Sequence, residues 1–541
     1  MKPLGLLGGT ALAVGALLAA PVLFVVANVF RGGGETWSHL AATGLPAYTW
    51  NTLLLLVAVA WGVISMGVLS AWLVTAYRFP GRDVLEWALM LPLAMPAYVM
   101  AYAYTDWLQF SGPVQTALRS LTGWGAREYW FPEIRSLAGA AAMLSFALYP
   151  YVYLIARTAF HDMPRSAIEA ARLAGHGPWG AFWRVAVPLA RPAIAAGASL
   201  ALMETLADFG TVSYFAVEVF TIGIFKAWFS MGDVVAAAQL SSCLLGFVVL
   251  LLALERSSRG RAAYHSVAPR KPVPAQRLSR APGLLAFAAC AAPVAFGFAL
   301  PGILLVTLAW GEKAAYFGAR FLALAGNSFS VAGLTAVVAV VLAIVMAYAA
   351  RLTRSRWVGA ANRAASLGYA VPGAVIAVGV LVPLGKLDNA AADAIEALFG
   401  IKTGLLLTGT VVALVYAYLV RLLAVALQTT EAGLAKVTPS MEHAARSLGA
   451  SAAGALARVH VPLLAGSLAT AALLVFVDVL KELPATFALR PFNFDTLAIE
   501  AYNLAKDERL AEAAVPSLVI VAIGLLPVIY VAKRYFQATR S

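Results

Sequence analysis

Long apolar runs alternate with short polar segments along the whole chain. Twelve runs are long enough to cross about 30 Å of hydrocarbon, a distance that takes about 20 helical residues. They lie at residues 3–29, 51–76, 86–110, 137–157, 192–214, 234–254, 283–310, 328–350, 365–385, 403–421, 465–487 and 515–532. The pattern predicts an all-α polytopic membrane protein with about twelve transmembrane helices.

The composition agrees with this prediction. Hydrophobic residues make up 62% of the 541 residues and charged residues only 12%. A soluble core of this size could not bury so much apolar surface. The first run follows Lys2 and is too long for the apolar part of a signal peptide, so we expect it to be an uncleaved span.

The placement of basic residues predicts the orientation, because short positively charged loops stay in the cytoplasm. With the N-terminus inside, the inner segments hold 26 of the 39 Lys and Arg but only 7 of the 26 Asp and Glu. These segments are 1–2, 77–86, 157–192, 255–280, 351–363, 421–460 and the tail from 533. We therefore expect both termini in the cytoplasm. Topology explains the net charge of +13, so no nucleic-acid partner is needed.

One stretch occurs twice, 274 residues apart, at residues 169–189 and 443–463. The two 21-residue windows share 11 identities without a gap. Each copy predicts a short helix with an Ala-Ala pair, a glycine that can adopt positive φ, a second short segment and a proline where the next apolar helix begins. Such a compact helical knob suits a groove on a partner.

These loops resemble the EAA loop of binding-protein-dependent ABC transporter permeases. The first copy matches with Glu169, Ala170, Ala171, Arg172, Gly175 and Pro188. The second matches with His443, Ala444, Ala445, Arg446, Gly449 and Pro462, and it carries Glu442 one residue before the position of the family's glutamate. The resemblance implies that the two loops contact two separate ABC ATPase subunits. Those partners bind ATP and Mg, so we expect no cofactor in this chain.

The repeated loop falls between the fourth and fifth apolar runs of each half. This predicts two fused permease domains, 1–254 and 283–541, inserted in parallel and joined by a basic cytoplasmic linker at 255–282. The linker could lie on anionic membrane lipid or be a solvated connector. The outer segments 111–133 and 488–514 could receive an extracytoplasmic partner or supply interfacial aromatic belts.

Ionisable residues occur at matching places in the run after each loop. The 274-residue offset aligns Glu204 with Asp478 and Asp208 with Glu482, and Lys481 lies beside the second pair. The i,i+4 spacing predicts Glu204 and Asp208 on one helical face. Charges in a membrane are costly unless they are paired or face water.

Two interpretations of these five residues follow. They could line or gate a translocation route at the interface of the two halves, or they could form a structural network in which Lys481 neutralises an acid. We expect no fixed metal site among them, because cargo must be released. Gly210 and Pro484 align in the two copies and are expected to end or kink these helices.

The stretches from Thr205 to Phe215 and from Lys481 to Ala498 are similar to those of ferric-iron permeases. The resemblance implies uptake of Fe³⁺ handed over by a periplasmic binding protein. Carboxylates suit a hard cation but do not single out iron. Permeases for thiamine, sulfate or polyamines share the architecture, and an ion-coupled secondary transporter is a further alternative.

The sequence lacks the signatures of an ATPase or hydrolase. No G-x-x-x-x-G-K-[ST] motif occurs, and no Ser/His/Asp, HExxH or paired-Cys constellation stands in a plausible setting. We therefore expect no catalytic residues here, and the energy for transport must come from another chain or from an ion gradient.

Overall fold

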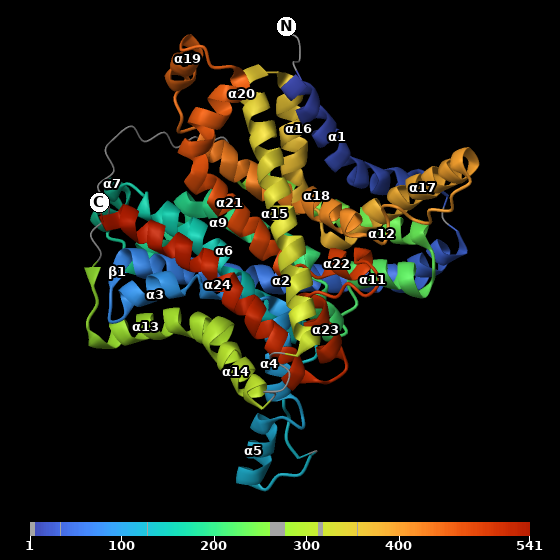
Figure 1. The fold of residues 1–541 in the computed structure, drawn as a ribbon. Coiled ribbons are helices and arrows are strands. Elements are labelled where there is room, and N and C mark those ends of the chain that lie inside the picture. Colours follow the sequence, from blue (N-terminus) through green and yellow to red (C-terminus); the bar gives the residue numbers. More distant parts are fainter. Residues whose placement is uncertain are drawn as a thin grey trace. The chain divides into compact units, whose positions relative to one another are not determined.

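A computed structural model describes residues 6–32, 34–126, 128–259, 276–311, 318–353 and 355–540. These residues are helical apart from turns and one short parallel pairing, of β1 (Tyr77–Arg78) with β2 (Gln276–Arg277). Figure 1 shows the helices and their order along the chain. The prediction of an all-α fold is confirmed.

The described part of the chain has eleven helices that are long and apolar enough to cross a membrane. They are Leu7–Phe30, Glu35–Ala76, Leu137–His161, Pro178–Ala207, Val234–Ser258, Arg280–Trp310, Ala319–Thr353, Gly373–Phe399, Val411–Leu434, Ala452–Leu480 and Leu510–Tyr530. Two further helices, Arg82–Ala94 and Ala97–Thr122, are bent by 92° relative to each other. If this pair counts as one span, the number of spans is twelve. The predicted number of about twelve is confirmed.

The helices group into two compact units. Unit 1 comprises Met1–Leu40, Gly223–Leu245 and Ala314–Glu500. Unit 2 comprises Ala41–Ile222, Gly246–Lys313 and Ala501–Ser541. Each unit therefore takes segments from both halves of the sequence. The division into domains 1–254 and 283–541 stays a prediction, and residues 260–275 of the linker lie outside the described residues.

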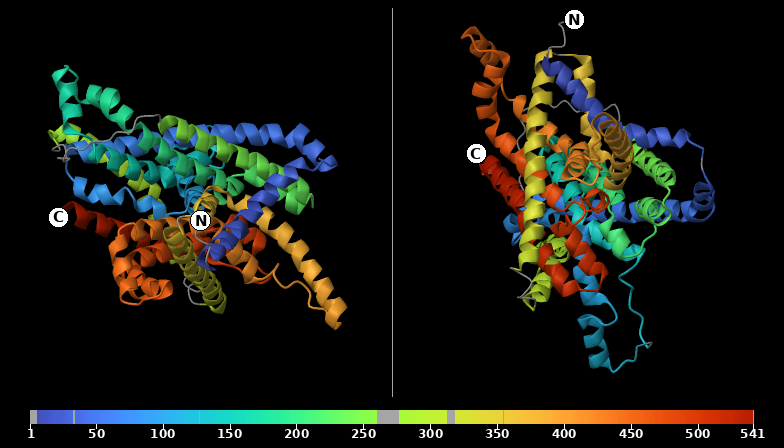
Figure 2. Two further views of the ribbon diagram at one scale, coloured as in Figure 1. Left: turned by 90° about the horizontal axis from the view of Figure 1, so that it is seen from above. Right: turned by 45° about the vertical axis from the view of Figure 1, so that its right-hand side comes forward.

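Unit 1 is built around three long helices that pack against one another: α15 (Ala319–Thr353), α18 (Val411–Leu434) and α21 (Val461–Leu480). Helix α15 runs without a break, as Figure 2 shows. The helices α1 (Leu6–Ala27), α16 (Arg356–Leu367) and α17 (Gly373–Phe399) also pack in this unit. Small residues let these helices approach closely.

Unit 2 is built around α6 (Leu137–His161) and α9 (Val187–Ala207). A Cβ at Gly197 of α9 would lie 2.7 Å from the Cα of Val152 in α6, so only glycine permits this approach. The other helices of the unit's core are α2 (Glu35–Ala76), α4 (Ala97–Leu108), α14 (Leu300–Trp310) and α24 (Leu510–Arg540).

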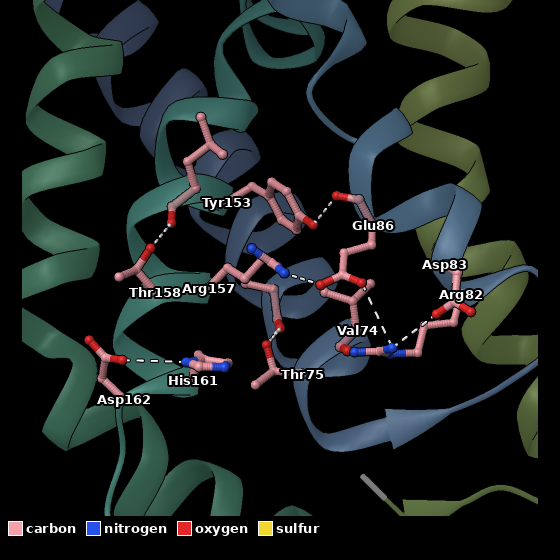
Figure 3. Close-up of polar contacts among 12 residues, drawn as sticks. Val74, Thr75, Arg82, Asp83, Glu86, Tyr153, Arg157, Thr158, His161 and Asp162 are labelled. Atoms are coloured by element: carbon pink, nitrogen blue, oxygen red, sulfur yellow. Dashed lines mark hydrogen bonds and ion pairs between the residues drawn. The ribbon is translucent and has the colours of Figure 1, made fainter. Parts of the chain in front are cut away.

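A buried ion pair joins two helices of unit 2. Arg157 of α6 pairs with Glu86 of α3 (Arg82–Ala88), as Figure 3 shows. The Tyr153 hydroxyl donates to the Glu86 carbonyl oxygen at 2.6 Å, and Arg82 lies 3.7 Å from the Glu86 carboxylate. With both charges compensated, the pair fixes α3 on α6.

Candidate functional site

The first repeated loop folds into two short helices before a transmembrane helix. It contains α7 (Arg165–Leu173), α8 (Pro178–Ala181) and the π-helical turn η3 (Phe182–Ala186), which leads into α9. Gly175 lies between α7 and α8 with φ of 80°. Side-chain-bearing residues disfavour this left-handed conformation, so glycine is what allows the chain to turn here.

The second repeated loop has the same elements in the same order. It contains α19 (Pro439–Ser447), Gly449 with φ of 85°, α20 (Ala452–Ala455) and the π-helical turn η8 (Leu456–His460). Helix α21 then begins, as Figure 1 shows. The predicted order of helix, glycine, short segment and proline-started helix is therefore present in both copies. The two π-helical turns were not predicted.

Each loop exposes an apolar tip. Leu173 in the first loop is 90% exposed and Leu448 in the second is 89% exposed. Glu169 and Ala170 are also exposed, whereas Ala171 is buried. In the second copy Ala444 is exposed and Ala445 is half-buried, and Pro188 and Pro462 open the helices that follow the loops. The side chains of Arg172, His443 and Arg446 lie outside the described residues.

Apolar packing holds the first loop on its unit. Phe182 of η3 lies 5.3 Å from Trp72 of α2 and 6.4 Å from Phe160 of α6, measured between ring centroids. Ile168 of α7 is buried as well. The loop therefore rests on aromatic and aliphatic contacts.

Charged side chains hold the second loop. Glu442 of α19 is only 7% exposed, and its Oε2 lies 3.3 Å from Nε of Arg351 and 3.8 Å from Nε2 of the buried His460. The 274-residue offset aligns Glu442 with the buried Ile168, not with the exposed Glu169. Glu442 therefore points inward and does not replace the surface glutamate of the first copy.

The span after the first loop breaks where the acids stand. Helix α9 ends at Ala207, Asp208 is extended with ψ of 134°, and α10 (Gly210–Tyr214) follows. The prediction that Glu204 and Asp208 share one helical face is therefore wrong, because the helix has ended. The Asp208 carboxylate instead accepts hydrogen bonds from the Val212 amide at 3.1 Å and the Thr211 hydroxyl at 3.0 Å.

The span after the second loop breaks in the same way. Helix α21 ends at Leu480, and α22 (Pro484–Leu489) begins four residues later. The buried Glu482 carboxylate accepts hydrogen bonds from the amides of Ala485 at 2.8 Å and Thr486 at 2.9 Å. Asp208 and Glu482 thus satisfy the first N–H groups of the short helices that follow them. The expected helix breaks near Gly210 and Pro484 are present.

The other three of the five ionisable residues singled out in the sequence are partly exposed. Lys481 Nζ lies 2.8 Å from Asp478 Oδ1, and the two side chains are 34% and 21% exposed. Glu204 is half-buried in the last turn of α9. The structure therefore supports the pairing of Asp478 with Lys481 that the network interpretation requires. A role of these residues in translocation stays a prediction.

Sequence reasoning missed a polar and aromatic cluster in unit 2. The Tyr102 ring of α4 lies 4.8 Å from the Tyr214 ring of α10, measured between centroids. Arg135 contacts the Tyr214 hydroxyl at 3.3 Å and pairs with Glu508 at 2.7 Å. The repeated Tyr residues of α4 were a usable signal, but nothing in the sequence linked them to residues 135 and 508.

In the described ranges, no group of three or more His, Cys, Asp or Glu side chains could hold a metal ion.

Comparisons with known proteins show what the chain is similar to. Residues 63–257, which include the first loop, match the family described as binding-protein-dependent transport system inner membrane component. Over 531 residues the chain is 28% identical to the Fe(3+)-transport system permease protein FbpB 2 of Haemophilus influenzae, covering 97% of each protein. Residues 63–257 therefore resemble an inner-membrane component of a binding-protein-dependent transport system. This match and the eleven long apolar helices of the described residues agree with a multi-pass inner-membrane protein.

Two further relatives match a part of the chain. The sulfate transport system permease protein CysT of Escherichia coli is 28% identical over 192 residues, which are 34% of this chain and 66% of the relative. The molybdenum transport system permease protein ModB of the same organism is 30% identical over 156 residues, which are 29% of this chain and 65% of the relative. The iron-transport relative is matched along nearly its whole length, and these two are matched over about two thirds.

Proposed function

We propose that the chain is a permease that imports ferric iron delivered by a periplasmic binding protein, and that two separate ATPase subunits drive it. The observation that carries the proposal is the pair of matching loops in a chain that resembles an iron-transport permease over 97% of its length. The excess of basic residues in the inner segments supports a topology with both termini in the cytoplasm. In that topology both loops face the ATPase subunits.

The geometry of the loops supports docking. Each presents a short helix, a left-handed glycine and an exposed leucine to its surroundings. An apolar tip on a rigid helical knob fits a groove with little loss of conformational entropy. The first loop adds the exposed carboxylate of Glu169.

For the translocation route we propose that Glu204, Asp478 and Lys481 line or gate the path, because these three side chains are partly exposed. Asp208 and Glu482 each hold the helix break in their own copy, and an irregular backbone at membrane depth is tolerated where it lines a cavity or is packed by protein. Binding along such a route must be weak enough for release. A cation beside the acids lowers their attraction for Fe³⁺.

Transport by the reconstituted complex tests the proposal. We expect proteoliposomes that contain the permease, its ATPase subunits and internal ATP to take up Fe³⁺ from the loaded binding protein. Uptake that follows an imposed proton or sodium gradient without any ATPase subunit would show a secondary transporter instead. Titration of the binding protein with Fe³⁺, sulfate and molybdate identifies the solute, and preference for an oxyanion would contradict the iron assignment.

The turn at Gly175 offers a test of the first loop. Gly175→Val places a β-branched residue at φ of 80°, which costs at least about 1–2 kcal/mol and distorts the turn between α7 and α8. We expect fewer ATPase subunits to copurify with this variant. Gly177→Val is the matched control, because Gly177 has φ of −63° and a Cβ added there would meet no atom within 4 Å. Equal yields from both variants would contradict the role of the turn.

A further inference from the structure

One arginine in unit 1 joins three elements at the second loop. Arg351 lies in the last turn of α15, and its two terminal nitrogens donate to the carbonyl oxygens of Leu434 and Val437 at 2.8 Å each. Its Nε donates to Glu442 at 3.3 Å. Leu434 ends α18, Val437 lies between α18 and α19, and Glu442 belongs to α19. The planar guanidinium thus fixes α15, the end of α18 and α19 in one arrangement.

A second side chain of α15 contacts the part of the second loop that follows Gly449. Tyr348 precedes Arg351 by three residues and therefore lies on the same face of the helix. Its hydroxyl donates to the Ala452 carbonyl oxygen at 3.1 Å, and its ring centroid lies 5.3 Å from that of His460. Helix α15 therefore contacts the loop on both sides of Gly449.

The first loop has no such charged contact in the described residues. The positions aligned with Glu442 and His460 are Ile168 and Ala186, and both are buried. Apolar packing resists separation but allows neighbouring surfaces to slide, whereas a charge-assisted hydrogen bond fixes direction as well as distance. In the part of the chain that the structure describes, the two loops are therefore attached through different kinds of contact.

We propose that Arg351 and Glu442 are a positioning pair that couples the second loop to α15, so that loop movement during the ATPase cycle is passed directly to this transmembrane helix. The proposal rests on the function proposed above, because it assumes that an ATPase moves the loop. It assigns to Glu442 an inward, mechanical role in place of a contact with the ATPase.

Simultaneous measurement of ATP hydrolysis and uptake tests the pair. The full complex, with ATPase subunits and Fe³⁺-loaded binding protein, is reconstituted with Arg351→Met, Glu442→Gln or Arg351→Lys. We expect Fe³⁺ uptake per ATP hydrolysed to fall about tenfold or more in the first two variants, because small misplacements have large effects on coupled steps. Arg351→Lys should recover part of this loss, since it keeps a positive charge opposite Glu442.

Glu86→Gln is the matched control. It removes the carboxylate of a comparably buried arginine pair, between α3 and α6, that lies outside both repeated windows. We expect uptake per ATP to stay at the wild-type value in this variant. An equal fall in Glu86→Gln and Glu442→Gln would overturn the proposal, because loss of any buried pair would then suffice.

Loop mobility gives a readout that needs no substrate. In chains with Cys243 and Cys290 replaced by alanine, a spin label is attached at Leu448 of the second loop or at Leu173 of the first. Arg351→Met should increase label mobility at 448 and leave it unchanged at 173. Unchanged label mobility at position 448 would overturn the proposal that Arg351 holds the second loop. Absence of ATP-driven iron uptake in the wild type would contradict the proposed function and leave this measurement valid.

Discussion

Replacing Glu482 by alanine is expected to lower the free energy of unfolding by about 3 kcal/mol. The carboxylate accepts hydrogen bonds from the amides of Ala485 and Thr486, and removal leaves both N–H groups buried without an acceptor, at about 1–3 kcal/mol each. Thermal or denaturant unfolding in detergent measures the change. Asp208→Ala should behave similarly because Asp208 plays the same part before α10.

Asp478→Ala is the control for this loss. Asp478 lies four residues earlier and forms a partly exposed pair with Lys481, a kind of contact that contributes about 0–1 kcal/mol. A destabilisation by Asp478→Ala as large as that by Glu482→Ala would contradict the capping role of Glu482.

The glutamine variants separate structure from translocation. The amide oxygen in Glu482→Gln can still accept a backbone hydrogen bond, so we expect most of the stability to remain. If charge at this position serves transport, Fe³⁺ uptake should fall while assembly and basal ATP hydrolysis persist, and Glu204→Gln should act likewise. Failure of these two variants to fold or to reach the membrane would make the residues structural and the pathway assignment wrong.

Local signals in the sequence predicted the loops and the helix breaks. Glycine at 175 and 449 marks a left-handed turn in both copies, and the proline that follows marks the next helix. Gly210 and Pro484 likewise marked the ends of the broken spans. These features depend on a few neighbouring residues. Because both copies of the repeat carry the same residues at the same spacing, the features can be recognised from the sequence.

Features that depend on direction or on distant contacts were not predictable. The i,i+4 spacing of Glu204 and Asp208 assumed a continuous helix, and the end of α9 at Ala207 removes that basis. One helical position rotates a side chain by about 100°, so the exposed position of Glu169 in the first copy did not reveal that Glu442, one position out of register with it, points inward. The mixing of both sequence halves in each compact unit reflects packing across hundreds of residues, which apolar periodicity does not encode.

The inward direction of Glu442 sharpens the expected difference between the loops. Glu169 is exposed on α7, and the second copy offers no exposed glutamate at the matching position, which His443 occupies. We therefore expect Glu169→Lys to weaken ATPase binding, because the variant reverses a charge at the proposed interface. The expected loss is about 10–100-fold in affinity, which corresponds to about 1.4–2.7 kcal/mol of binding free energy. Titration of the permease with purified ATPase subunits measures the affinity.

Two comparisons make this result specific. Asp162→Lys reverses an exposed acid at the end of α6, outside both repeated windows, and should leave the affinity within about twofold of wild type. Glu169→Ala should cost more affinity than His443→Ala, because only the first removes an exposed carboxylate. Equal losses from the two alanine variants would show that the loops dock in the same way, and an equal loss from Asp162→Lys would reduce the effect to long-range charge.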